Sequence, residues 1–188
     1  MSDNHPELSR IGIKIENIDS RYKPLLRMGI SIDEMIYLAR RLYPLIKDYK
    51  RILDLACGNC LIGVILSKLT NAEIHGIDDW SQISKNEVME NVKRDSKMVL
   101  SDLINFQLPY ENSYFDLVYT VMYLSNIGKE GRIKIANEVR RVLKNNGKFI
   151  VIDTVVFRGK IKKDLESTFK LEWYGEENAF SYFIFSPK

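Results

Sequence analysis

Residues 51–60 read Arg-Ile-Leu-Asp-Leu-Ala-Cys-Gly-Asn-Cys, and the apolar run Leu-Ile-Gly-Val-Ile-Leu follows directly at residues 61–66. An apolar strand that closes on an acid and a turn of small residues, with a helix beginning at once, is typical of a nucleotide-type cofactor site. Such a turn brings backbone N–H groups and a helix N-terminus close to a ligand, and large side chains would block the approach. Ala56 and Gly58 leave that space open.

Two other kinds of site use a similar turn. A dinucleotide-binding turn needs small residues in the order Gly-x-Gly-x-x-Gly/Ala, and counting from Ala56 and Gly58 the third place falls on Leu61, so this interpretation fits poorly. Cys57 and Cys60 form a C-x-x-C between a strand and a helix, which is the pattern of a thioredoxin-like disulfide site. No Trp precedes Cys57, and more strand–helix units follow than that small fold uses. The disulfide alternative is weakened but stays open.

The placement of Asp54 fits a third family best. Residues 52–60 follow the pattern apolar-apolar-Asp-x-small-x-Gly-x-small, and a second strand, residues 73–78, ends in an acid 78 − 54 = 24 residues later. The pattern resembles motif I of the class I S-adenosylmethionine-dependent methyltransferases. Cys60 stands where that family usually has its last glycine and Ala56 where it has the first, so this turn is slightly bulkier.

Two later segments support the resemblance. Ser-Asp-Leu at residues 101–103, followed by Leu-Pro-Tyr-Glu-Asn-Ser-Tyr-Phe-Asp-Leu-Val at 108–118, looks like the stretch in which an Asp faces the adenine and the fourth strand begins. Residues 138–152, Glu-Val-Arg-Arg-Val-Leu-Lys-Asn-Asn-Gly-Lys-Phe-Ile-Val-Ile, resemble the helix, glycine turn and fifth strand of the branch with ubiquinone-type and small-molecule methyltransferases. The chain therefore resembles this class over residues 51–152.

The resemblance implies an α/β fold: a seven-stranded, mostly parallel, doubly wound sheet that closes with a C-terminal antiparallel β-hairpin. Aromatic residues on both sides of a Gly175 turn, within residues 165–188, predict that hairpin independently. We expect residues 1–49 to form an N-terminal helical extension or lid, to which Tyr22 and Arg27 contribute, and residues 50–188 to form the cofactor-binding domain.

Hydrophobic periodicity gives the elements. A capping box at residues 31–34 begins a helix that bends or ends near Pro44, after an N-terminal stretch of loop or short helices. We expect Asn145, Asn146 and Gly147 to provide a left-handed exit from the helix before the last parallel strand. The predicted strands are 51–56, 73–78, 97–101, 115–121 and 147–156, and the predicted helices between them are 60–69, one within 81–94, and 130–144.

The resemblance also implies S-adenosylmethionine as the cofactor and assigns its contacts. Asp78 is expected to accept from both ribose hydroxyls and to be exposed in the empty cleft, with Asp79 as an alternative. Asp102 would accept from the adenine amino group, beside Leu103, and Trp80 would stack near the adenine or pack in the core. The candidate cofactor contacts are Asp54, Ala56, Cys57, Gly58, Asp78, Asp79, Trp80, Asp102, Leu103 and Tyr119.

Asp54 would orient the amides of the turn or a water near the methionine end, or cap the loop. Tyr119 and Thr120 end the fourth strand, where the backbone in the resembling family reaches the amino group of the cofactor. Cys57 and Cys60 are interpreted as small fillers of the turn rather than redox groups, and two thiols without a nearby His fall short of a four-ligand metal site. We therefore predict no metal.

A catalytic base does not stand out, because His5 lies in an irregular terminus and His75 lies within a strand. Transfer to a good nucleophile needs none, since holding donor and acceptor in line contributes about 7–11 kcal/mol. The chain has Tyr-Thr-Val-Met-Tyr at residues 119–123 where enzymes that methylate amino groups of DNA and protein glutamine carry Asn/Asp-Pro-Pro-Tyr, which weighs against both substrates. Tyr123 would line the acceptor pocket or belong to the core.

The composition limits the number of domains and the classes of partner. The 188 residues, 45% of them apolar, suit one domain, and the net charge of +3 does not indicate nucleic acid, although it does not exclude RNA. No apolar run approaches the ~20 residues of a membrane span, and Met-Ser-Asp-Asn-His lacks the pattern of a signal sequence, so we expect a cytoplasmic protein without membrane contact.

The function that the sequence favours is in-line methyl transfer from S-adenosylmethionine to an undetermined acceptor, a small molecule being favoured over a protein or RNA side chain. A protein partner or a homodimer stays open. One alternative is a non-catalytic cofactor-binding subunit that activates or positions a partner. A second alternative is a thiol-disulfide protein that uses Cys57 and Cys60.

Overall fold

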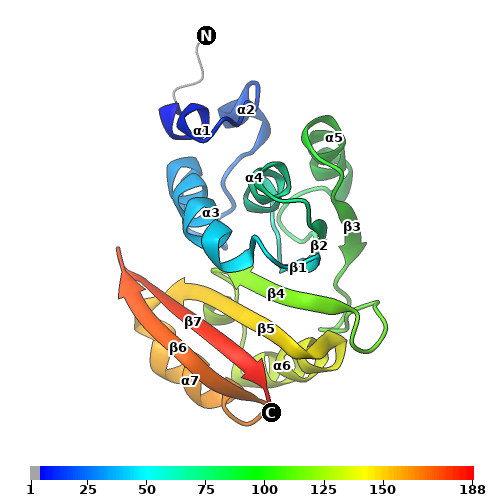
Figure 1. Ribbon diagram of the computed structural model, residues 1–188, viewed down its shortest axis with the longest axis vertical. Helices are drawn as coiled ribbons and strands as arrows, with labels where there is room; N and C mark the ends of the chain where they lie inside the picture. Colours follow the sequence, from blue (N-terminus) through cyan, green and yellow to red (C-terminus); the bar gives the residue numbers. More distant parts are fainter. Residues whose placement is uncertain (1–4) are drawn as a thin grey trace.

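A seven-stranded sheet runs through the centre of the computed structural model, which describes residues 5–188 (Figure 1). Residues 1–4, part of the stretch read above for a signal sequence, lie outside the described residues. The strand order is β3-β2-β1-β4-β5-β7-β6; the first five strands pair in parallel, and β7 is antiparallel to β5 and β6. The strands are β1 (Arg51–Leu55), β2 (Glu73–Asp78), β3 (Val99–Asp102), β4 (Phe115–Val121), β5 (Leu143–Thr154), β6 (Phe169–Glu177) and β7 (Phe180–Pro187). The predicted α/β fold with its antiparallel hairpin is confirmed.

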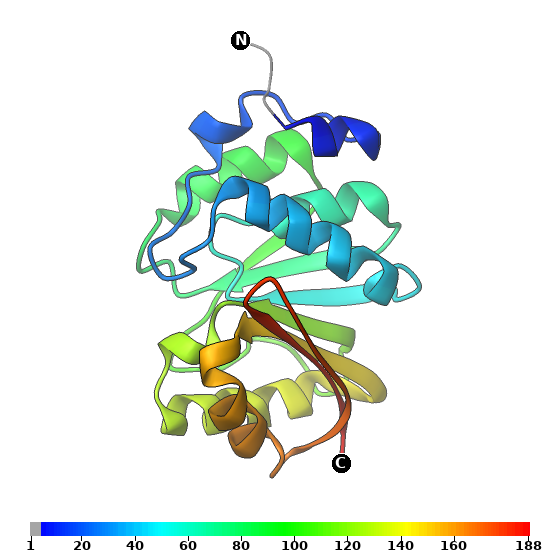
Figure 2. The same cartoon turned by 90° about the vertical axis from the view of Figure 1, so that its left-hand side faces the viewer.

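Helices cover both faces of the sheet, as Figure 2 shows. One face packs against α3 (Ile32–Ile46), α4 (Leu61–Leu69) and α5 (Lys85–Asp95), and the other against α6 (Lys129–Val142) and α7 (Arg158–Leu165). The short helices α1 (Pro6–Arg10) and α2 (Ile18–Arg21) lie outside α3 and α5. Ile13, Ile18 and Tyr22 are buried in the same hydrophobic cluster as α3 and α4, so the N-terminal stretch shares the core of the sheet domain.

The helix α3 begins as its sequence predicts. The Ser31 hydroxyl accepts from the Glu34 amide at 3.2 Å, and the Glu34 carboxylate accepts from the Ser31 amide at 2.8 Å. The capping box is thereby complete. The helix ends at Ile46, two residues beyond Pro44, so the predicted end near the proline is confirmed.

The exit from α6 differs from the prediction. Asn145, Asn146 and Gly147 belong to β5 and none of them is left-handed; the chain turns extended at Leu143, which already pairs with Phe115. Gly147 is needed for close packing, since a Cβ there would lie 2.6 Å from Leu143 Cδ2 and 2.9 Å from the Asp116 carbonyl.

The C-terminal part holds two elements that the sequence did not predict, the 3-10 helix η2 (Val155–Phe157) and the helix α7, which fill the connection from β5 to the hairpin. The hairpin turns at Asn178 and Ala179, both with positive φ, and not at Gly175, which lies within β6. Across residues 5–188, no helix combines the length and the apolar composition that crossing a bilayer requires.

Candidate cofactor site

The carboxyl ends of β1, β2, β3 and β4 meet at one edge of the sheet, where β1 lies between β2 and β4. At such a switch in strand order the loops diverge, and ligands of open α/β sheets bind there. The turn after β1 is strongly curved, because Ala56, Gly58 and Cys60 all have positive φ (60°, 57° and 63°). The Asn59 side chain accepts from the amide of Leu61, the first residue of α4, at 3.0 Å and closes an Asx turn before the helix.

Asp78 joins this turn to the end of β2. Its Oδ2 accepts from the Gly58 amide at 2.8 Å and from the Arg27 guanidinium at 3.0 Å, and its Oδ1 accepts from the Trp80 amide at 3.1 Å. The side chain is only 6% exposed, so the expectation of an exposed carboxylate was wrong: residues 23–29 cover it. Burial raises the pKa of Asp78, and the Arg27 charge opposes that rise.

Strand β3 places the candidate adenine contacts beside Asp78. Asp102 pairs with Asp78 in the β2–β3 register, and its exposed carboxylate accepts from Trp80 Nε1 and from the Lys85 ammonium, both at 2.8 Å. The Lys85 partner lowers the pKa of Asp102. Leu103 is buried and donates its amide to the Asp78 carbonyl at 2.9 Å. The structure thus brings Asp78, Trp80, Asp102 and Leu103 together at the edge.

Asp79 lies beside Asp78, close enough for the two carboxyl groups to interact. Its carboxylate accepts from the Ser81 amide at 2.9 Å and caps the loop that leads to α5. Of the two acids that the sequence offered for the ribose position, Asp78 is therefore the one that contacts the turn after β1.

Asp54 and Tyr119 lie inside the molecule rather than at the edge. They are neighbours in the β1–β4 register, and Asp54 Oδ2 and the Tyr119 hydroxyl are both buried without a hydrogen-bond partner among the described residues. Burial raises the pKa of Asp54 to about 7. Tyr119 lies two residues before the end of β4 at Val121, so the position after the strand is taken by Met122, with a φ of 53°.

The two cysteines are buried side by side in the turn. The Cys60 thiol contacts the Cys57 sulfur at 2.9 Å, and both are free. Burial raises the pKa of each thiol, so the helix N-terminus does not produce a thiolate here. This environment is that of a packing residue. Among residues 5–188, no group of three His, Cys, Asp or Glu side chains is arranged to hold a metal ion.

Residues 23–29, which we call the strap, cross the same edge. Leu25 and Met28 lie over Gly58, where a Cβ would meet Leu25 Cδ1 at 2.9 Å and Met28 Sδ at 3.0 Å. Arg27 inserts between Asp78 and the Ala56 carbonyl, 3.2 Å from its Nη2, and its guanidinium lies 5.6 Å from the centre of the buried Tyr123 ring.

Sequence reasoning named Arg27 as part of a lid but missed Leu25 and Met28. Their signal was available: two apolar residues three apart, in a short stretch bounded by Pro24 and Gly29, form the apolar side of a turn. The sequence could not show that this turn lies over Gly58, because that contact joins residues far apart in the chain.

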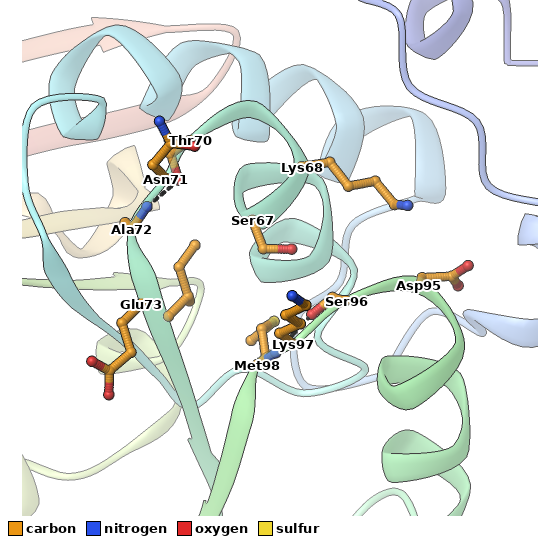
Figure 3. Close-up of a pocket in the computed structure, with 11 residues that line it drawn as sticks. Ser67, Lys68, Thr70, Asn71, Ala72, Glu73, Asp95, Ser96, Lys97 and Met98 are labelled. Atoms are coloured by element: carbon orange, nitrogen blue, oxygen red, sulfur yellow. Dashed lines mark hydrogen bonds between the residues drawn. The ribbon is translucent and has the colours of Figure 1, made fainter.

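A cavity of about 590 Å³ lies elsewhere on the molecule, and Figure 3 shows the residues that line it. It lies where β2 and β3 begin, at the opposite edge of the sheet, and is lined by residues including Lys68, Thr70, Glu73, Asp95 and Lys97. It contains none of the candidate cofactor contacts.

Comparisons with known proteins agree with this geometry. Residues 53–151, more than half of the chain, match the family described as "Methyltransferase domain". The chain belongs to this family, and its fold is that of a class I S-adenosylmethionine-dependent methyltransferase domain.

Among curated proteins, the chain is similar to the demethylmenaquinone methyltransferase of Thermotoga maritima, with 30% identity over 118 residues, 60% of this chain and 49% of that protein. The chain spans about half of this relative and 57% of an uncharacterised Methanocaldococcus jannaschii protein that is 29% identical over 142 residues. Among solved structures, a TehB-like S-adenosylmethionine-dependent methyltransferase of Corynebacterium glutamicum superimposes with a TM-score of 0.66 at 20% identity, covering 92% of this chain and 97% of that one. A Pyrococcus horikoshii protein gives 0.72 at 21% identity, with 84% and 92% coverage.

Proposed function

We propose that this chain is a methyltransferase that uses S-adenosylmethionine and transfers the methyl group in line from the sulfonium to an O, N, S or C nucleophile of an acceptor. The observation that carries the proposal is the hydrogen bond from the Gly58 amide to Asp78 at the switch in strand order, with Asp102 next to Asp78 in the register. Two acids on adjacent strands beside a close backbone turn suit the ribose and adenine of one nucleoside.

Different residues at the carboxyl edge would bind different parts of the cofactor. The turn at Gly58 and the N-terminus of α4 would face the methionine part, since backbone amides and the helix dipole favour a carboxylate. Asp78 would accept from the ribose hydroxyls, and Asp102 and Leu103 would hold the adenine. The bound cofactor supplies an electrophilic methyl group, and the protein supplies its position relative to the acceptor.

A small-molecule acceptor is favoured. Two of the curated relatives carry names of enzymes that act on demethylmenaquinone and on a sterol, both small molecules. Residues 1–49 would act as the extension that closes the pocket over the domain of residues 50–188, and Tyr123, beneath Arg27, would line the acceptor side. A protein or RNA side chain is the competing acceptor.

Titration calorimetry tests this function. S-adenosylmethionine and S-adenosylhomocysteine should each bind with one site per chain, whereas NAD should give no heat of binding, because the turn lacks the third small residue of a dinucleotide site. Binding of NAD alone would overturn the assignment. Cofactor binding without transfer to any acceptor from a small-molecule panel would favour the non-catalytic subunit.

A further inference from the structure

The strap occupies the place that the cofactor needs. The space above Gly58 that a small residue keeps open for a ligand is filled by Leu25 and Met28. Asp78, the acid placed to receive ribose hydroxyls, already accepts from Gly58, Arg27 and Trp80. Leu25 and Met28 would have to move before a nucleoside could contact the turn at Gly58, and Arg27 would have to release Asp78 Oδ2.

Hydrogen bonds hold the strap to the loops after three different strands. The Lys23 carbonyl accepts from Asn59 Nδ2 at 3.0 Å, in the loop after β1. The Arg27 amide donates to the Gln82 side chain at 2.9 Å, in the loop after β2, and the Arg27 carbonyl accepts from Asn126 Nδ2 at 3.0 Å, after β4. The strap therefore crosses the carboxyl ends of β1, β2 and β4.

Both ends of the strap are anchored, so it can lift only as a loop. Before it, the Tyr22 hydroxyl donates to Asp95 at 2.8 Å, and after it, Ser31 caps α3. Gly29, the last residue of the strap, has a φ of 61°, which glycine adopts without strain.

With the strap over Gly58, one buried donor of Arg27 has no hydrogen-bond partner among the described residues. This donor is Nη1, and an unpaired buried donor weakens the state that contains it. Leu26 is 95% exposed within the same strap. These features suit a segment that leaves the cleft when a competing ligand arrives.

We propose that the strap is an autoinhibitory contact, with Arg27 as its latch: it competes with the cofactor for Asp78 and Gly58, and cofactor binding requires its displacement. The inference rests on the proposed function. In this proposal the strap first controls the entry of the cofactor, and only afterwards could the N-terminal residues contact the acceptor.

The affinity for S-adenosylhomocysteine tests the latch. If the strap is closed nine-tenths of the time, the apparent Kd is raised about tenfold, so Arg27→Ala should tighten binding by up to about tenfold. Lys23→Ala is the matched control, since it removes a positive charge from the same strap while the lysine side chain is exposed and outside the latch. Its Kd should equal that of the unchanged protein.

The outcomes separate the two proposals. Tighter binding by Arg27→Ala, or binding by that variant alone, supports the latch. Equal affinities, or weaker binding by Arg27→Ala, overturn it and leave the proposed function standing, because Arg27 would then be a bystander or a cofactor ligand. If neither the unchanged protein nor the variant binds, the proposed function fails and the latch with it.

Limited trypsin digestion gives a second test that needs no variant. Displacement of the strap would expose the Arg27–Met28 bond, so S-adenosylhomocysteine should accelerate cleavage there, with NAD at the same concentration as the control. Protection of this bond by S-adenosylhomocysteine, or unchanged cleavage at saturating ligand, would show that the strap stays in place on binding and contradict the proposal.

Discussion

The carboxylate of Asp78 is held by three segments of the chain: the turn after β1, the strap and its own loop. The Arg27–Asp78 ion pair is largely withdrawn from water, with side-chain exposures of 11% and 6%. Removing one partner from such a pair leaves the other charge buried and unpaired, which costs more than the pair itself contributes. Asp78 is therefore both a candidate ligand residue and a structural one.

Asp78→Ala should consequently lose cofactor binding and also lower the free energy of unfolding by about 1–3 kcal/mol, because the Gly58 amide and Arg27 lose their acceptor. Urea denaturation measures the second effect. In the double variant with Arg27→Ala, much of that loss should be recovered. If the double variant instead loses as much free energy of unfolding as the two single variants together, Asp78 and Arg27 are not coupled.

Asp54 gives a pH-dependent prediction. Burial raises its pKa from 3.8 to about 7, so between these values the native state binds a proton that the unfolded state does not. The free energy of unfolding should fall as pH rises from about 4 to about 7 and stay low above that. Asp54→Asn removes this contribution, and the stability difference between the two proteins should shift toward the variant by up to about 4 kcal/mol across the window. Parallel stability–pH curves would contradict the burial of an ionising Asp54.

At the scale of elements, the predictable parts are those whose signals are local. β1, β2 and β4 are apolar runs with defined ends, and α3 carries its own cap, so the sequence predicts them within a residue or two. The predicted left-handed exit from α6 was wrong because Asn and Gly tolerate a left-handed turn without requiring one. In the fold, pairing of Leu143 with Phe115 extends the chain before those residues are reached.

The close packing around Gly147 makes the stability of the protein sensitive to a single added methyl group. Gly147→Ala should destabilise the protein by about 1–3 kcal/mol, because the new Cβ meets the Asp116 carbonyl at 2.9 Å and the Lys144 carbonyl at 3.0 Å. Gly159→Ala in α7 is the control: nothing lies within 4 Å of its Cβ, and alanine favours a helix, so its stability should hold or rise by up to about 1 kcal/mol. Thermal unfolding compares the two, and equal melting temperatures would refute the close packing at Gly147.

At the scale of the whole molecule, the candidate site is assembled by topology. Asp78 and Asp102 end neighbouring strands, so the family pattern in the sequence was enough to expect both near one ligand. The strap was beyond prediction, since its contacts with Gly58, Gln82 and Asn126 join an irregular N-terminal segment to three distant loops. Tertiary contacts of irregular segments carry no periodicity by which a sequence reveals them.

A crystal structure with S-adenosylhomocysteine would show both where the ligand binds and whether the strap moves. We expect ligand density at the carboxyl ends of β1, β2 and β3, with the ribose at Asp78, the adenine between Asp102 and Leu103, and the strap lifted from Gly58. Density for the ligand at another place, such as the cavity where β2 and β3 begin, or density at the carboxyl edge with Arg27 still paired to Asp78, would contradict this expectation.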